Sequence, residues 1–94
     1  MYKIEYTERA IIELNNIYNY IYYNLVNPIA AQKFREQIPK PISNLEYFPY
    51  MGKKISNSNL RYLIFKNYLI FYSVNDQNVE IQRVIHKNQK LRYD

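Results

Sequence analysis

Hydrophobic and polar residues alternate at the start of the chain, where Tyr2, Ile4 and Tyr6 are separated by Lys3 and Glu5. A period of two residues is typical of a strand with one buried face. The pattern therefore predicts a first strand at the N-terminus.

Two helices are predicted next, because the apolar period changes from two residues to three and four. The first helix begins after Thr7, which can cap it, and it carries one apolar stripe. The stripe consists of Ala10, Leu14, Ile17, Tyr18, Ile21 and Leu25. The second begins at Asn27 and Pro28, a capping residue followed by proline at the first helical position. Pro39 and Pro41 then predict a kink or an early end, because each removes a backbone donor.

Three strands are predicted in the second half of the chain. After a turn at "FPYMG" and a polar loop, the runs "LRYLIF", "YLIFYSV" and "VEIQRVIH" are separated by short polar connections. The middle run is apolar on both sides and should be the central strand. The order strand, helix, helix, strand, strand, strand predicts an α+β fold in which two helices pack on one face of an antiparallel sheet.

Length and composition narrow the classes of function. A chain of 94 residues with 48% hydrophobic content suits a single domain over residues 1–94. It has no cysteine and one histidine, so we expect no disulfide, no metal site and no cofactor. No apolar run approaches the ~18 residues of a membrane helix, and polar residues interrupt the N-terminus where a secretion signal would be apolar. We expect a cytoplasmic protein that does not bind membranes.

Positive charge is confined to one half of the chain. Residues 1–47 carry five basic and five acidic side chains, whereas residues 48–94 carry eight basic and three acidic ones, so the net charge of +5 belongs to the second half. This asymmetry indicates a polyanion or an acidic partner on that side. The alternative is a solvated basic surface that serves solubility alone.

Five segments, in their order and spacing, resemble the RelE/ParE superfamily of small toxins from bacterial type II toxin-antitoxin modules. They are "YKIEYTERAIIELNNIYNYI", "NPIAAQKF", "ISNLEYFPYMG", "LRYLIFKNYLIFYSV" and "VEIQRVIHKNQ". The resemblance covers essentially the whole chain. It implies a compact toxin that is neutralised by an antitoxin encoded beside it.

Two mechanisms occur in that superfamily. RelE-like members cut messenger RNA on the ribosome, with the ribose 2′-hydroxyl attacking the adjacent phosphate, whereas ParE-like members inhibit DNA gyrase without cutting RNA. The cutting reaction needs a base near the hydroxyl, cations against the developing phosphate charge and an acid for the leaving oxygen. The candidates for these catalytic roles are Arg61, Arg83 and His86.

Each candidate also has a structural interpretation. By strand alternation Arg83 shares a face with Val79, Ile81 and Ile85, so it is either an anion-binding group in a cleft or a stem laid over apolar surface. His86 can act as an acid or a base near neutral pH, but a single histidine at a strand end is more often structural or exposed.

One position favours the ParE branch. RelE-like nucleases usually carry an arginine directly after the first tyrosine of the run similar to "YLIFYSV", and this chain has Leu69 there. The loop "GKKISNSN" also lacks the glutamate that some nuclease members use. The resemblance thus favours a growth inhibitor that acts on gyrase. Ribosome-dependent mRNA cleavage is the alternative, and an inactive module that only binds the antitoxin is a further one.

An antitoxin partner explains the basic half without catalysis. An acidic, partly disordered segment could lie against the sheet and the helices, gaining both charge complementarity and apolar burial. We expect such a complex, in which toxin and antitoxin could form an oligomer. The residues predicted to bind the antitoxin or the target are Lys53, Lys54, Arg61, Arg83, Lys87, Lys90 and Arg92.

Overall fold

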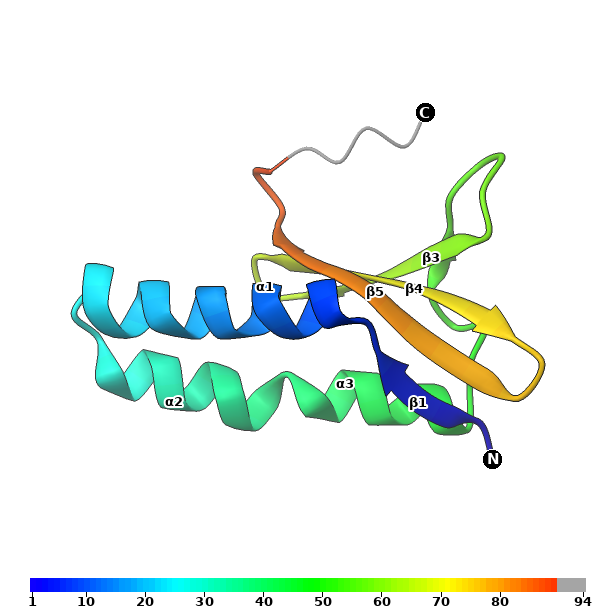
Figure 1. Ribbon diagram of the computed structural model, residues 1–94, viewed down its shortest axis with the longest axis horizontal. Coiled ribbons are helices and arrows are strands. Elements are labelled where there is room, and N and C mark those ends of the chain that lie inside the picture. Colours follow the sequence, from blue (N-terminus) through cyan, green and yellow to red (C-terminus); the bar gives the residue numbers. More distant parts are fainter. Residues whose placement is uncertain (90–94) are drawn as a thin grey trace.

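A five-stranded sheet forms one layer of the computed structural model, and the helices form a second layer against it (Figure 1). The structure describes residues 1–89. The strands are β1 (Lys3–Tyr6), β2 (Lys53–Lys54), β3 (Leu60–Phe65), β4 (Tyr68–Asn75) and β5 (Asn78–His86). They lie in the order β1-β5-β4-β3-β2, so the apolar β4 is central, as its sequence predicted. The α+β fold class is confirmed.

The sheet is mixed, whereas the sequence predicted an antiparallel one. β2 to β5 form antiparallel pairs, but β1 runs parallel to β5, with Lys3 opposite Asn78 and Tyr6 opposite Ile81. Strands that pair in parallel need a long crossover between them, and here the helices and the other strands supply it. The periodicity identified β1 as a strand but carried no signal for its partner or its direction.

The first helix begins where the sequence predicted but ends in a different geometry. α1 (Glu8–Asn19) follows Thr7, whose Oγ1 accepts a hydrogen bond of 3.0 Å from the N–H of Ala10. It continues as a π-helical turn, η1 (Tyr20–Asn24). Leu25 was predicted on the apolar stripe, yet its side chain is 56% exposed. The wider π turn removes it from the helical register that places the stripe against the core.

The second helix ends early, as its prolines predicted. α2 (Pro28–Gln37) starts after Asn27, whose Oδ1 caps the N–H of Ala30 at 3.0 Å. A short helix, α3 (Pro39–Ser43), and a 3-10 turn, η2 (Asn44–Glu46), then follow. Both prolines fall in the first turn of α3, where backbone donors have no intrahelical acceptor. The break therefore redirects the chain and leaves Ile38 and Ile42 buried.

The main core fills the space between the helices and the sheet. Its buried members are Ala10, Ile21, Ala31, Phe34, Ile38, Ile42, Leu45, Ile70, Tyr72, Val79, Ile81 and Val84. A smaller buried cluster, made of Ile55, Phe71 and Ile85, lies on the opposite face of the sheet, because alternate residues of β4 point to opposite sides. Within residues 1–89 no helix is long and apolar enough to cross a membrane.

A β-bulge in β5 overturns the predicted alternation around Arg83. Between Ile81 and Arg83 the pairing with β4 shifts by one residue, which leaves Gln82 unmatched. Before the bulge the odd-numbered residues of β5 face the helices, and after it the even-numbered residues do. Val84 therefore belongs to the main core, and Ile85 lies on the opposite face of the sheet. Val79 and Ile81 thus lie on the face that the helices cover and Ile85 lies on the other, so the single apolar face predicted around Arg83 does not exist.

Candidate functional site

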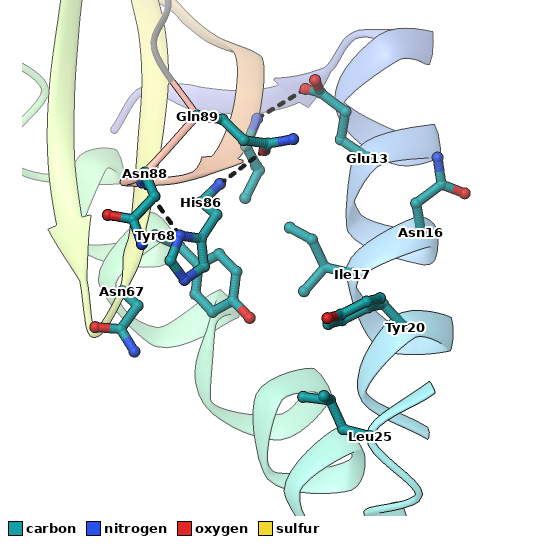
Figure 2. Close-up of a pocket in the computed structure, with 11 residues that line it drawn as sticks. Glu13, Asn16, Ile17, Tyr20, Leu25, Asn67, Tyr68, His86, Asn88 and Gln89 are labelled. Carbon is teal, nitrogen blue, oxygen red and sulfur yellow. Dashed lines mark hydrogen bonds between the residues drawn. The ribbon is translucent and has the colours of Figure 1, made fainter. Parts of the chain in front are cut away.

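A cleft of ≈ 820 Å³ separates the first helix from the turn between β3 and β4 and from the end of β5 (Figure 2). Its helical wall consists of Glu13, Asn16, Ile17, Tyr20 and Leu25. The first four recur at the spacing of one helix face, which is why α1 and η1 present them together. The opposite wall consists of Asn67, Tyr68, Val84, His86, Asn88 and Gln89. The cleft is therefore lined mainly by amides, aromatic rings and aliphatic groups.

His86 lines this cleft, as a candidate acid or base would have to. Its Nδ1 accepts a hydrogen bond of 3.1 Å from the N–H of Asn88, which assigns the proton of the neutral ring to Nε2. The backbone N–H of His86 donates to Oε1 of Gln89 at 3.2 Å, and the imidazole ring packs edge-on against the ring of Tyr68. Within residues 1–89, Nε2 has no hydrogen-bond partner. The imidazole is therefore oriented by its neighbours and keeps one nitrogen available.

Arg83 is held in an ion pair at the rim of the cleft. Its Nη2 lies 2.7 Å from Oε2 of Glu13, and its Nε lies 2.9 Å from the same oxygen. The other carboxylate oxygen accepts the N–H of Val84 at 2.9 Å. The two side chains are only 20% and 17% exposed. Arg83 therefore fixes α1 to β5, a role that sequence reasoning did not assign to it.

Arg61 is occupied in a different part of the molecule. Its Nη1 donates to the carbonyl oxygens of Gly52 and Tyr50, at 3.0 and 3.2 Å. In the same turn the N–H of Gly52 donates to the hydroxyl of Tyr72 at 2.8 Å, and Tyr72 is fully buried. Arg61 and Tyr72, which are opposite each other in β3 and β4, thus hold the "FPYMG" turn from beneath. Arg61 lies outside the cleft.

The structure does not gather the predicted basic residues into one cluster. Lys53 and Lys54 are exposed in β2 at one edge of the sheet, whereas Lys87 is exposed just after β5. Three strand spacings separate β2 from β5, roughly 14 Å across the sheet. Lys90 and Arg92 lie outside the described residues. Among those that are described, no three His, Asp or Glu side chains are grouped to hold a metal ion.

Sequence reasoning missed Glu13 and most of the helical wall. The available signal was the spacing of Glu13, Asn16, Ile17 and Tyr20, which places a carboxylate, an amide and a phenol on the same face as an apolar residue. The bonds that Glu13 makes to β5 had no counterpart in the sequence pattern, because they depend on the bulge.

Tyr6, Tyr68 and Tyr72, near the cleft and the core, have a raised pKa, because burial disfavours the charged phenolate. Burial raises the pKa of Tyr68, and the neighbouring Tyr20 raises it further. Burial also raises the pKa of Tyr6 and of Tyr72, although the hydrogen bond from Gly52 and the charge of Arg61 partly oppose the shift of Tyr72. These hydroxyls remain neutral at physiological pH and can donate hydrogen bonds.

The raised tyrosine pKa values give an expected alkaline limit to stability. Tyr68 and Tyr72 have a higher pKa in the folded protein than the ordinary value of 10.0. Their neutral hydroxyls therefore stabilise the fold fully below about pH 10, and this stability is lost as the pH rises through the folded-state pKa. Urea unfolding at pH 8, 10 and 11 should show this loss. The Tyr72→Phe variant should lose less stability than wild type between pH 10 and 11, and an equal loss would mean that Tyr72 does not contribute to it.

Comparisons with known proteins agree with the fold described above. A family model described as "ParE toxin of type II toxin-antitoxin system, parDE" matches residues 4–91. A solved chromosomal ParDE system from P. aeruginosa is similar at 21% identity and a TM-score of 0.80, over 92% of this chain and 96% of that one. A RelB-RelE antitoxin-toxin complex from Methanococcus jannaschii is similar at 20% identity and a TM-score of 0.58, over 89% and 91%. A comparison with curated proteins gives no match.

The family model spans nearly the whole chain, and the sequence resemblance had pointed to the same superfamily and branch. This chain belongs to the ParE toxin family of type II toxin-antitoxin systems.

Proposed function

We propose that this toxin inhibits DNA gyrase and does not cleave RNA. The observation that carries the proposal is that both candidate arginines are occupied within the protein. The guanidinium of Arg83 is bound by the carboxylate of Glu13, and that of Arg61 donates to two backbone carbonyls. Cleavage through the 2′-hydroxyl needs cations against the developing phosphate charge. The cleft therefore lacks the main electrostatic component of that reaction.

The lining of the cleft supports the same proposal. It includes no lysine or arginine among the described residues, and the carboxylate of Glu13 faces it. Leu69, which stands where RelE-like nucleases usually have an arginine, packs against the small cluster on the other face of the sheet. A surface of amides, tyrosines and aliphatic groups suits a protein segment better than a phosphodiester, whose oxygens bind mostly to cations and backbone N–H groups.

Ribosome-dependent mRNA cleavage is the second candidate, and one observation favours it. Nε2 of His86 is available, and Tyr68, whose hydroxyl stays neutral, packs against the imidazole in the same wall. A proton donor and a proton acceptor are thus present. They would have to act without an available arginine in the cleft.

The partner we propose is an acidic antitoxin encoded beside the toxin. Solved structures similar to this chain include a ParDE system and a RelB-RelE antitoxin-toxin complex. On this chain the exposed Lys53 and Lys54 follow closely on Phe48 and Tyr50, whose side chains are 66% and 58% exposed. Neighbouring positive and apolar groups suit an acidic amphipathic segment, which would gain from both.

A paired assay with the purified protein tests the proposed target. We expect loss of gyrase supercoiling in one reaction and an intact messenger in a translating-ribosome reaction. The His86→Ala variant should inhibit gyrase as wild type does. Messenger cleavage that requires ribosomes and is lost in His86→Ala would instead establish the nuclease. If a folded protein that binds its antitoxin is active in neither reaction, the remaining hypothesis is an inactive module that only binds the antitoxin.

Charge reversal in β2 tests the proposed antitoxin surface. The double variant Lys53→Glu and Lys54→Glu should bind the small protein encoded beside the toxin at least about 10-fold more weakly, mostly at low salt, because both exposed lysines would repel an acidic segment after reversal. Lys3→Glu, an exposed lysine of the neutral half, is the matched control and should bind as wild type does. Calorimetric affinities at two salt concentrations measure the difference, and equal affinities for all three proteins would exclude β2 from the surface.

A further inference from the structure

The end of the helical hairpin carries an exposed apolar surface that extends beyond the cleft. We call it the tip patch, and it consists of Tyr20, Tyr23, Leu25, Val26 and Ile29. Their exposed fractions lie between 54% and 78%. In Figure 1 the hairpin formed by α1, η1 and α2 projects past the ends of the strands, so no strand covers this end of the molecule.

The backbone at the centre of the tip patch is strained. Val26 has a φ of 51°, in the left-handed region that a β-branched side chain rarely adopts. The turn requires this conformation, because the N–H of Asn27 bonds back to the carbonyl of Ile21 as the helix ends. Glycine is the usual residue in such a position. The side chain of Val26 is 78% exposed, so packing within the chain does not offset the strain.

The tip patch is also free of charge. Residues 14–32 contain no acidic or basic side chain, although 22% of the chain is charged. A second exposed apolar surface, which includes Phe48 and Tyr50, is followed closely by Lys53 and Lys54 and has Arg61 beneath it. That surface suits an acidic partner. The tip patch offers such a partner no charge to pair with.

We propose that the tip patch binds a second copy of this chain, with the two hairpin tips meeting around a two-fold axis. Residues close to a two-fold axis lie near their own counterparts, so an interface centred on such an axis requires a surface that avoids like charges there, in a protein whose net charge is +5. The tip patch meets this requirement, whereas the basic edge of the sheet does not. Burial of Val26 in the dimer supplies the packing that the single chain lacks.

The size of the tip patch indicates a weak, reversible dimer. Five side chains of this type, exposed to this extent, amount to roughly 600 Å² per copy, somewhat below the ~800 Å² per partner of a standard specific interface. Interfaces below the standard size are mostly weak and transient, so the dimer should dissociate on dilution. Because the contact is apolar and each copy is positively charged, added salt should strengthen it, whereas salt would weaken an ionic contact.

Sedimentation of the purified chain between about 1 and 300 µM tests the proposal. We expect a shift from monomer to dimer that increases at higher salt. Val26→Asp, which brings two carboxylates together at the axis, should weaken the dimer at least 10-fold. Ile64→Asp changes a side chain that is 67% exposed on β3 and should leave the dimer intact. A chain that remains monomeric at 300 µM, or a dimer that Val26→Asp leaves unchanged, would overturn the proposal.

Val26→Gly separates loss of the interface from loss of the fold. Glycine relieves the left-handed strain, so the melting temperature should rise by about 4 °C while the dimer becomes weaker.

A second readout uses the absence of cysteine from the chain. Val26→Cys should form a disulfide-linked dimer under mild oxidation faster than Ile64→Cys, and equal rates would contradict a tip-to-tip contact. If the chain alone is monomeric and Val26→Asp instead blocks antitoxin binding, the tip patch belongs to the antitoxin and the proposal is wrong. None of these readouts depends on gyrase.

Discussion

Glu13→Ala is expected to lower the free energy of unfolding by about 3 kcal/mol. The substitution removes all three hydrogen bonds that the carboxylate accepts from the guanidinium of Arg83, and it leaves the N–H of Val84 without its acceptor. The two charged side chains are mostly buried, so solvent compensates only partly for the loss. Urea unfolding followed by circular dichroism measures the change.

Three further variants test whether the stability lost in Glu13→Ala comes from its contacts with Arg83 and Val84. Glu36→Ala removes an exposed helical carboxylate and should cost less than about 0.5 kcal/mol. Glu13→Gln keeps an acceptor for Val84 and should lose about half as much as Glu13→Ala. The charge swap, Glu13→Arg with Arg83→Glu, restores an ion pair but not the acceptor, so it should recover stability only in part. A Glu13→Ala protein as stable as Glu36→Ala would mean that the contact does not tie α1 to β5.

The Glu13 contact changes how variants at Arg83 must be interpreted. Arg83→Glu places two carboxylates against each other beside the bulge, so a loss of toxicity could follow from a loss of folded protein. The swap variant is the better probe of function. If it folds and remains toxic, the positive charge at Arg83 is not needed for contact with the target.

Gly52→Ala is expected to cost about 3 kcal/mol, the upper end of the range for overpacking. An added Cβ would lie 2.4 Å from the hydroxyl oxygen of Tyr72 and 2.7 Å from its Cε1. Tyr72 is fully buried and receives the Gly52 N–H, so its ring cannot withdraw without breaking that bond and disturbing the core. The φ of Gly52 is not positive, so close approach, rather than backbone freedom, requires glycine here.

A double-mutant cycle tests the origin of this cost. Tyr72→Phe alone should cost about 1 kcal/mol for the lost hydrogen bond. In the Tyr72→Phe background Gly52→Ala should cost less than it does in wild type, because the nearest clashing atom is gone. Ser56→Ala, an exposed position in the following loop, is the control and should be nearly neutral. Additive costs of the two substitutions would show that the hydroxyl is not the obstacle.

Local rules predicted most of the elements of this fold. The caps at Thr7 and Asn27, the break at Pro39 and the central position of β4 all follow from short-range patterns in the sequence. The parallel pairing of β1 with β5 was not predicted, because strand periodicity specifies a face but not a neighbour. The bulge at Gln82 was missed for the same reason, since a single unmatched residue leaves no compositional signal.

The candidate site was predicted only in part. His86 does line the cleft, but the arginines that seemed available to a phosphate are bound within the protein. Charge counts along a sequence cannot distinguish an exposed cation from one paired with a distant carboxylate. Glu13 and Arg83 come together only because α1 packs along β5, which is a long-range consequence of the topology.

The pairing of β1 with β5 also sets when the toxin can become native during its synthesis. Lys3 pairs with Asn78, and Thr7 and Glu13 bond to the bulged part of β5, so the first segments made must wait for the last strand. Contacts between residues so far apart in sequence form slowly and late. Native sheet therefore cannot be completed while β5 is still inside the ribosome. The cell that makes this toxin is thus exposed to its folded form only after β5 has left the ribosome.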